Sequence, residues 1–163
     1  MRNPAHPRRH LAPEAPLKIL QAAADTPSMD ALFFLSRHEQ ALGVAASDDL
    51  PAEPVADALQ LDDPSALLGL ADVLGVERGI RPLRDATCRS FPVWDLGDEI
   101  TARIAALDDA EIDAAAERWH ASGATHLDAD LYELASCLGD LREAVHGGYE
   151  GERLFVLLEE RAW

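Results

Sequence analysis

The feature that most constrains the fold is an unbroken apolar run near the end of the sequence, from Leu154 to Leu158. The run contains a β-branched and an aromatic residue, and it follows a glycine pair, Gly147-Gly148. A short run that is apolar at every position is typical of a central strand buried on both faces of a sheet. The sequence therefore predicts a strand over residues 153–158.

Two other short runs can pair with this strand. Residues 31–35 read Ala-Leu-Phe-Phe-Leu, and residues 91–94 read Phe-Pro-Val-Trp. Aromatic residues make up only 6% of the chain, which favours helix for most of the remainder. We predict an α+β fold, predominantly helical, with a small sheet built from strands near 32–35, 91–94 and 153–158. The alternative is an all-α bundle in which Leu154 to Arg161 continues as helix.

Polar residues placed before amphipathic segments predict where the helices begin. Asp108 and Glu111 have the spacing of a capping box, in which each side chain accepts a hydrogen bond from the backbone of the other residue. Ser36 and Glu39 have the same spacing. The predicted helices run from Ser36 to Gly43, from Asp63 to Gly75, from Asp95 to Leu107, from Asp108 to Gly123, and from Asp128 or Asp130 to Gly147, with a further short helix over Val55 to Leu61.

The order of these segments resembles that of a known protein family. An aromatic strand runs into a Leu-Ser-x-x-Glu helix start, and a Leu-rich helix is followed by a terminal Leu-Phe-Val-Leu-Leu strand. This pattern, over Ala31 to Gln40 and Phe91 to Leu158, is similar to that of the YfbM-like group of bacterial proteins. The resemblance implies a soluble bacterial α+β domain without assigned chemistry, and it transfers no functional residue.

The first 28 residues differ in composition from the rest of the chain. Four prolines lie among the first sixteen residues, and no apolar periodicity precedes Leu17. This composition predicts a mobile arm. An overlong start-site assignment is the alternative, since Met29 opens the first apolar segment. Residues 29–163 are predicted to form a single acidic α+β domain.

The net charge limits the classes of partner. The sequence has 30 Asp and Glu against 14 Lys and Arg, a formal charge of −16. Three of the basic residues, Arg2, Arg8 and Arg9, lie in the acid-free first ten positions, so the rest of the chain is more acidic still. Such a surface repels nucleic acids and anionic membranes and favours a basic protein surface. No apolar run is long enough to span a bilayer, and we expect a cytoplasmic protein.

Acidic residues around residues 108–117 are the candidate contacts for a basic partner. The helix that starts there carries a surplus of carboxylates. At the end of the chain, the large indole ring of Trp163 can belong to an interface. The sequence favours a non-enzymatic protein-interaction domain, similar to an immunity protein or an inhibitor. Its predicted partner-binding residues are Asp108, Asp109, Asp113, Glu117 and Trp163.

A group of arginines supports the alternative function. Apart from the arm, the only basic stretch contains Arg78, Arg81, Arg84 and Arg89. Guanidinium groups can bind a phosphate or carboxylate through two hydrogen bonds, so this stretch predicts a small-molecule anion-binding or enzymatic domain. In so acidic a domain, internal pairing with nearby carboxylates is the expected structural role.

No catalytic or metal-binding motif stands out. His120, His126 and Cys137 are of the residue types that bind zinc, but their spacing matches no zinc motif. The sequence lacks a nucleophile elbow and a phosphate-binding glycine loop. We therefore expect no metal and no cofactor. We expect Cys88 and Cys137 to be two separate reduced thiols, and a single disulfide between them is the alternative.

Overall fold

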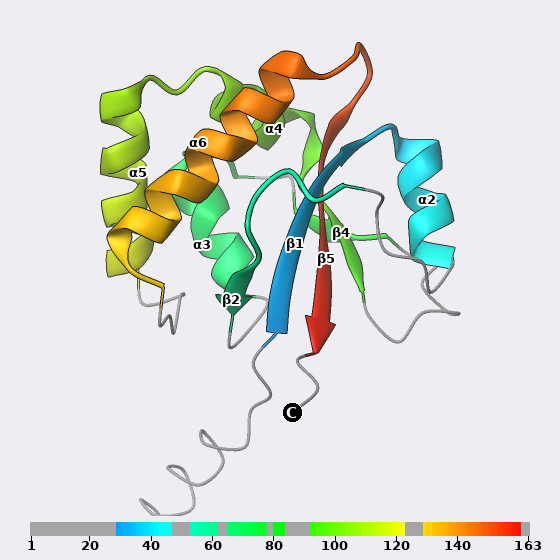
Figure 1. The fold of residues 1–163 in the computed structure, drawn as a ribbon, viewed down its shortest axis with the longest axis horizontal. Coiled ribbons are helices and arrows are strands. Elements are labelled where there is room, and N and C mark those ends of the chain that lie inside the picture. Colours follow the sequence, from blue (N-terminus) through cyan, green and yellow to red (C-terminus); the bar gives the residue numbers. More distant parts are fainter. Residues whose placement is uncertain are drawn as a thin grey trace, which may run out of the picture.

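The structure is a computed structural model, and it describes residues 29–46, 53–61, 65–77, 80–83, 92–122 and 129–160 (Figure 1). The predicted arm, residues 1–28, lies outside the described residues. So do several residues singled out in the sequence: Arg78, Arg84, Cys88, Arg89, Phe91, His126, Asp128 and Trp163.

A five-stranded antiparallel sheet forms the centre of the fold, in the order β2-β1-β5-β4-β3. Helices are the larger part of the described structure, so the predicted α+β class is confirmed, and the all-α alternative is wrong because residues 153–160 form a strand. The strands are β1 (Met29–Ser36), β2 (Leu59–Leu61), β3 (Arg81–Pro82), β4 (Val93–Asp95) and β5 (Arg153–Glu160).

The first and last described strands lie side by side at the middle of the sheet. β1 and β5 pair along their whole length, from Met29 opposite Glu160 to Ser36 opposite Arg153. Phe34 and Phe155 face each other across this pair, with ring centroids 5.6 Å apart. Residues 154–158 are all buried, as the unbroken apolar run predicts. Burial on both faces explains why this segment lacks the alternation of a surface strand.

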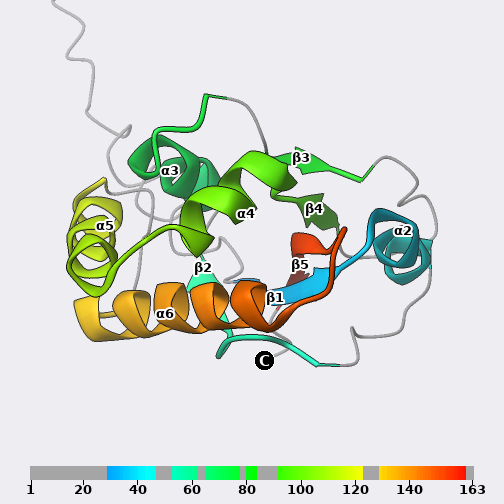
Figure 2. The same ribbon diagram turned by 90° about the horizontal axis from the view of Figure 1, so that it is seen from above.

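Helices cover the two faces of the sheet unequally (Figure 2). One face packs against α3, α4, α5 and α6 and forms the larger core, in which Trp119 and Phe33 are completely buried. The other face packs against α2 around Phe34, Phe155 and Leu157. The helices are α2 (His38–Ala46), α3 (Ser65–Val73), α4 (Gly97–Ala105), α5 (Asp109–Ala121) and α6 (Leu131–Gly147).

The capping box predicted at Asp108 is formed, and a second one, which was not predicted, begins α6. Asp108 accepts a hydrogen bond from the Glu111 N–H at 2.8 Å, and the Glu111 carboxylate accepts one from the Asp108 N–H. Asp130 and Glu133 make the same pair of bonds at the start of α6. Of the two alternatives for this helix, Asp130 is therefore the cap. A cap of this kind contributes about 1 kcal/mol to helix stability.

Two predictions in the first half of the chain are wrong. Ser36 is the last residue of β1 and its hydroxyl donates to the Arg37 carbonyl, so it forms no capping box with Glu39, and α2 continues past Gly43 to Ala46. The predicted helix over Val55 to Leu61 is also absent. Val55 donates its N–H to the Phe33 carbonyl at 2.8 Å, and residues 59–61 form β2. The apolar spacing fits either structure, and pairing with the edge of β1 decides for the strand.

The sequence did not predict β2 or β3, which are three and two residues long. Strands this short contain little periodic signal, and they exist because a longer neighbour offers backbone partners. None of the described helices is both long and apolar enough to cross a membrane.

Candidate functional site

The predicted acidic residues lie together on α5 and its cap, but two of them are already engaged within the fold. Asp108 holds the capping box, and Asp109, although its side chain is 93% exposed, pairs with Arg142 of α6 at 2.9 Å. Asp113 and Glu117 are one helical turn apart and exposed. Within the part of the chain that the structure describes, neither makes an ion pair. These two carboxylates are therefore free to contact a partner.

The predicted arginine group can be followed only at Arg81, since its other members lie outside the described residues. Arg81 lies in β3, with a side chain that is 73% exposed. Its Nη2 atom is 3.9 Å from the Asp95 carboxylate in β4. For this arginine, the expected internal pairing with a nearby acid is confirmed. The anion-binding role of the group stays a prediction.

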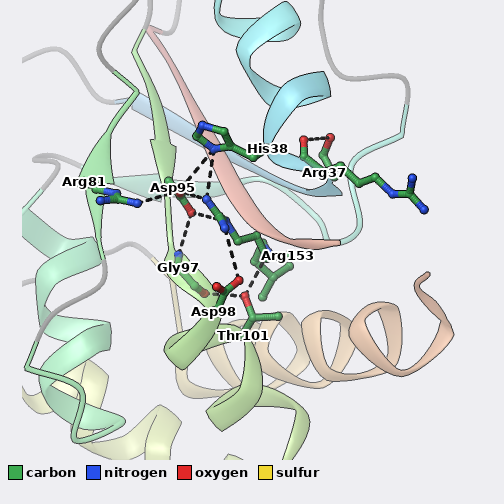
Figure 3. A network of polar contacts seen from close by, with 10 residues as sticks. Arg37, His38, Arg81, Asp95, Gly97, Asp98, Thr101 and Arg153 are labelled. Atoms are coloured by element: carbon green, nitrogen blue, oxygen red, sulfur yellow. Dashed lines mark hydrogen bonds and ion pairs between the residues drawn. The ribbon is translucent and has the colours of Figure 1, made fainter. Parts of the chain in front are cut away.

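Asp95 and Arg153 form the centre of a polar network between α2, β3, β4, α4 and β5 (Figure 3). The Asp95 side chain is completely buried, and Arg153 donates to both of its carboxylate oxygens, through Nε at 2.9 Å and through Nη2. The Gly97 N–H donates to the same carboxylate at 2.9 Å, and Gly97 has a positive φ of 81°, which glycine adopts without strain. Burial alone lowers the pKa of Arg153, but the hydrogen bonds and charges of Asp95 and Asp98 outweigh it and raise that pKa above its usual value.

The same guanidinium also fixes the orientation of His38 at the start of α2. Arg153 Nη2 lies 3.1 Å from His38 Nδ1, and the same ring nitrogen is 3.9 Å from the Asp95 carboxylate. Arg153 Nη1 lies 3.4 Å from Asp98 in α4. With four hydrogen bonds to three residues of the fold, Asp95, Asp98 and His38, Arg153 is a clamp between elements and is poorly placed to bind an external anion.

A cavity of about 280 Å³ lies between α6 and the segment that leads into β2. This segment passes along β1 beside α6 (Figure 1), where the bond from Val55 to Phe33 holds it. Among the residues that the structure describes, the walls carry three carboxylates, Asp57, Glu133 and Asp140, and no Lys, Arg or His. A second hollow of about 400 Å³ adjoins the first and shares Asp57 and Asp140 with it. The described residues that line the first cavity are Asp57, Ala58, Leu59, Gln60, Ala129, Tyr132, Glu133, Ser136, Cys137 and Asp140.

Cys137 forms part of the cavity wall and reports on its electrostatics. Its side chain is only 3% exposed, and burial is the main cause that raises its pKa to about 12. The charges of Asp140 and Asp57, which line the same cavity, are the smaller causes of this shift. The thiol therefore stays protonated at neutral pH, which makes it a poor nucleophile and metal ligand. Among the described residues, no cluster of three or more His, Cys, Asp or Glu side chains could hold a metal ion.

Sequence reasoning did not identify this cavity. Tyr132, Glu133, Ser136, Cys137 and Asp140 follow three-and-four spacing on α6, so their shared side of the helix could have been found. Asp57 gave no such signal, because it reaches the cavity only through the pairing of its segment with β1.

Comparison of the chain with protein-family models, with curated proteins and with solved structures finds no match. The resemblance to the YfbM-like group therefore stays a prediction.

Proposed function

We propose that this chain is a non-enzymatic protein-interaction domain that binds a basic partner through its acidic surface, in the manner of an immunity protein or an inhibitor. The observation that carries the proposal is the cavity beside α6, where each charged side chain among the described lining residues is a carboxylate, from Asp57, Glu133 or Asp140. A concave surface of one charge sign attracts ligands of the opposite sign and speeds their association.

The exposed side of α5 carries further carboxylates that a basic partner could contact. Asp113 and Glu117 point away from the core, while Ile112, Ala115 and Trp119 of the same helix are buried. Exposed carboxylates of this kind add little to the stability of the fold, because solvent screens them. Their contribution to a complex is to steer the approach of a basic partner, an effect that weakens as salt rises.

Two features favour binding over catalysis. The pKa of Cys137 is raised, so its thiol is not activated as a nucleophile at neutral pH. Arg153 and Asp95 hold each other and their neighbours in the fold, which leaves this pair without a group aimed at a substrate. The free thiol of Cys137 also fits a reducing compartment, and we propose that the protein acts in the cytoplasm.

The test measures binding of a fluorescent nona-lysine peptide by anisotropy at low and high salt. We expect the affinity to fall by about tenfold or more between 50 and 500 mM NaCl, because the attraction is between exposed charges. Replacing the two α5 carboxylates, as Asp113→Asn with Glu117→Gln, should slow association. The matched control is Asp72→Asn with Glu99→Gln, which removes the same two charges from exposed positions on α3 and α4. Binding that is insensitive to salt, or equal in the two double variants, would contradict an electrostatic interface on this side of the protein.

A further inference from the structure

We propose that the cavity beside α6 receives an arginine side chain of the basic partner, in preference to a lysine. This inference rests on the function proposed above and assigns its anchoring contact. The cavity is bounded by carboxylates from two separate segments, Asp57 before β2 and Asp140 on α6. A planar guanidinium can donate to two carboxylates at once, whereas an ammonium is a compact and more strongly hydrated charge.

The buried wall of the cavity supports a ligand with an apolar stem and a charged end. Leu59 and Ala129 are less than a tenth exposed and line the cavity together with Ala58. The methylene stem of an arginine can cover such surface while its guanidinium reaches the acids.

The thiol of Cys137 is a second observation at the same wall. It is almost completely buried, and it makes no hydrogen bond within the described part of the chain. Asp57 and Asp140 line the same cavity as this thiol. A cation placed there would offset two negative charges and give the sulfur a donor.

Tyr132 indicates that the partner contacts more than the cavity itself. Its side chain is 80% exposed although it lines the cavity, so the ring lies at the mouth. Tyr132 precedes Asp140 by eight residues, roughly 12 Å along a helix. The ring is therefore placed to pack on the segment that carries the arginine, while the guanidinium lies deeper. Exposed aromatic rings beside charged pockets are typical of contact points in interfaces.

The experiment compares three capped peptides, acetyl-Lys-Gly-X-Gly-Lys-amide, in which X is arginine, lysine or citrulline. Citrulline has the shape of arginine without its charge. Binding is followed by NMR titration at 50 mM NaCl, with the amide signals of Ser136 and Cys137 as local reporters. We expect the arginine peptide to bind about fivefold more tightly than the lysine peptide and about tenfold more tightly than the citrulline peptide.

The variant Asp57→Asn with Asp140→Asn should remove the preference for arginine. Glu133 is left unchanged because its carboxylate caps α6. The control is again Asp72→Asn with Glu99→Gln, which should bind all three peptides as the unmodified protein does. Circular dichroism and urea unfolding would show that both variants are folded.

The outcomes separate this inference from the proposed function. If arginine and lysine peptides bind equally, the arginine assignment is wrong but a basic partner stands. If the citrulline peptide binds as well as the arginine peptide, or if the cavity variant behaves like its control, the cavity is not the anchoring site. If neither these peptides nor nona-lysine bind, both proposals are wrong.

Discussion

Removing Arg153 tests whether the buried pair with Asp95 holds the sheet to its neighbouring helices. The completely buried Asp95 carboxylate accepts three close hydrogen bonds, two from Arg153 and one from the Gly97 N–H. In the variant Arg153→Met, only the bond from Gly97 remains. Hydrogen bonds to charged groups contribute about 1.5 to 3 kcal/mol each, and two are lost. In other proteins, removing one partner of a buried ion pair costs about 3 to 5 kcal/mol, which agrees with the loss of two such hydrogen bonds. We therefore expect the free energy of unfolding to fall by about 3 to 5 kcal/mol.

The matched control uses the same carboxylate and the same residue type. Arg81 also approaches Asp95, but at 3.9 Å and with a side chain that is 73% exposed, against 18% for Arg153. Exposed pairs contribute about 0 to 1 kcal/mol, so Arg81→Met should change stability little. The additional variant Arg153→Met with Asp95→Asn removes the stranded charge and should be more stable than Arg153→Met alone.

Urea unfolding followed by circular dichroism measures these differences, with linear extrapolation and a check that the slope is unchanged. Small domains are typically stable by about 5 to 15 kcal/mol, so the Arg153 variant should still fold at low temperature. If Arg153→Met costs no more than Arg81→Met, the network of Figure 3 is not a structural clamp and our interpretation of it is refuted.

Three other predictions concern single groups. The raised pKa of Cys137 means that its contribution to stability is complete below pH 9.0, the ordinary value, and is lost as pH rises toward about 12. We compare the Cys88→Ser protein with a second variant that also carries Cys137→Ser. Above pH 9, the free energy of unfolding of the first should fall more steeply than that of the second, by about 1.4 kcal/mol per pH unit. Parallel curves of unfolding free energy against pH would refute this prediction. Trp119→Phe removes the buried Nε1–H donor from the Ala66 carbonyl, 3.0 Å away, and should cost about 1 to 3 kcal/mol in urea unfolding. Asp130→Ala removes the cap of α6 and should lower stability by about 1 kcal/mol, whereas an unchanged melting temperature would show that the cap is dispensable.

The elements that sequence reasoning predicted well depend on contacts that are close along the chain. The capping box at Asp108 joins residues three apart, and α3 ends near Gly75, whose φ of 70° suits glycine. The strand over residues 153–158 is predicted because full burial on two faces leaves a continuous apolar run, and in the structure it extends to Glu160. In each case, the residues that cause the structure lie within the element they define.

The elements that were missed depend on distant partners. Asp95 was expected to cap α4, yet the cap position is Leu96, and the carboxylate instead binds Arg153, 58 residues away. The segment at residues 55–61 has helical spacing, but the open edge of β1 draws it into an extended strand. Local propensity contributes tenths of a kcal/mol per residue, so pairing with a neighbouring strand readily overrides it.

By itself, the sequence determined the fold class, the central strands, the cap of α5 and the sign of the net charge, because local hydrogen bonds, side-chain spacing and composition are properties of the chain alone. Only the tertiary structure decided which charges remain available. It buried Asp95 against Arg153, paired Asp109 with Arg142, and brought Asp57 to the same cavity as Asp140. Which carboxylates meet depends on how the segments pack across the sheet, and that packing joins residues whose separation along the chain gives no sign of their contact.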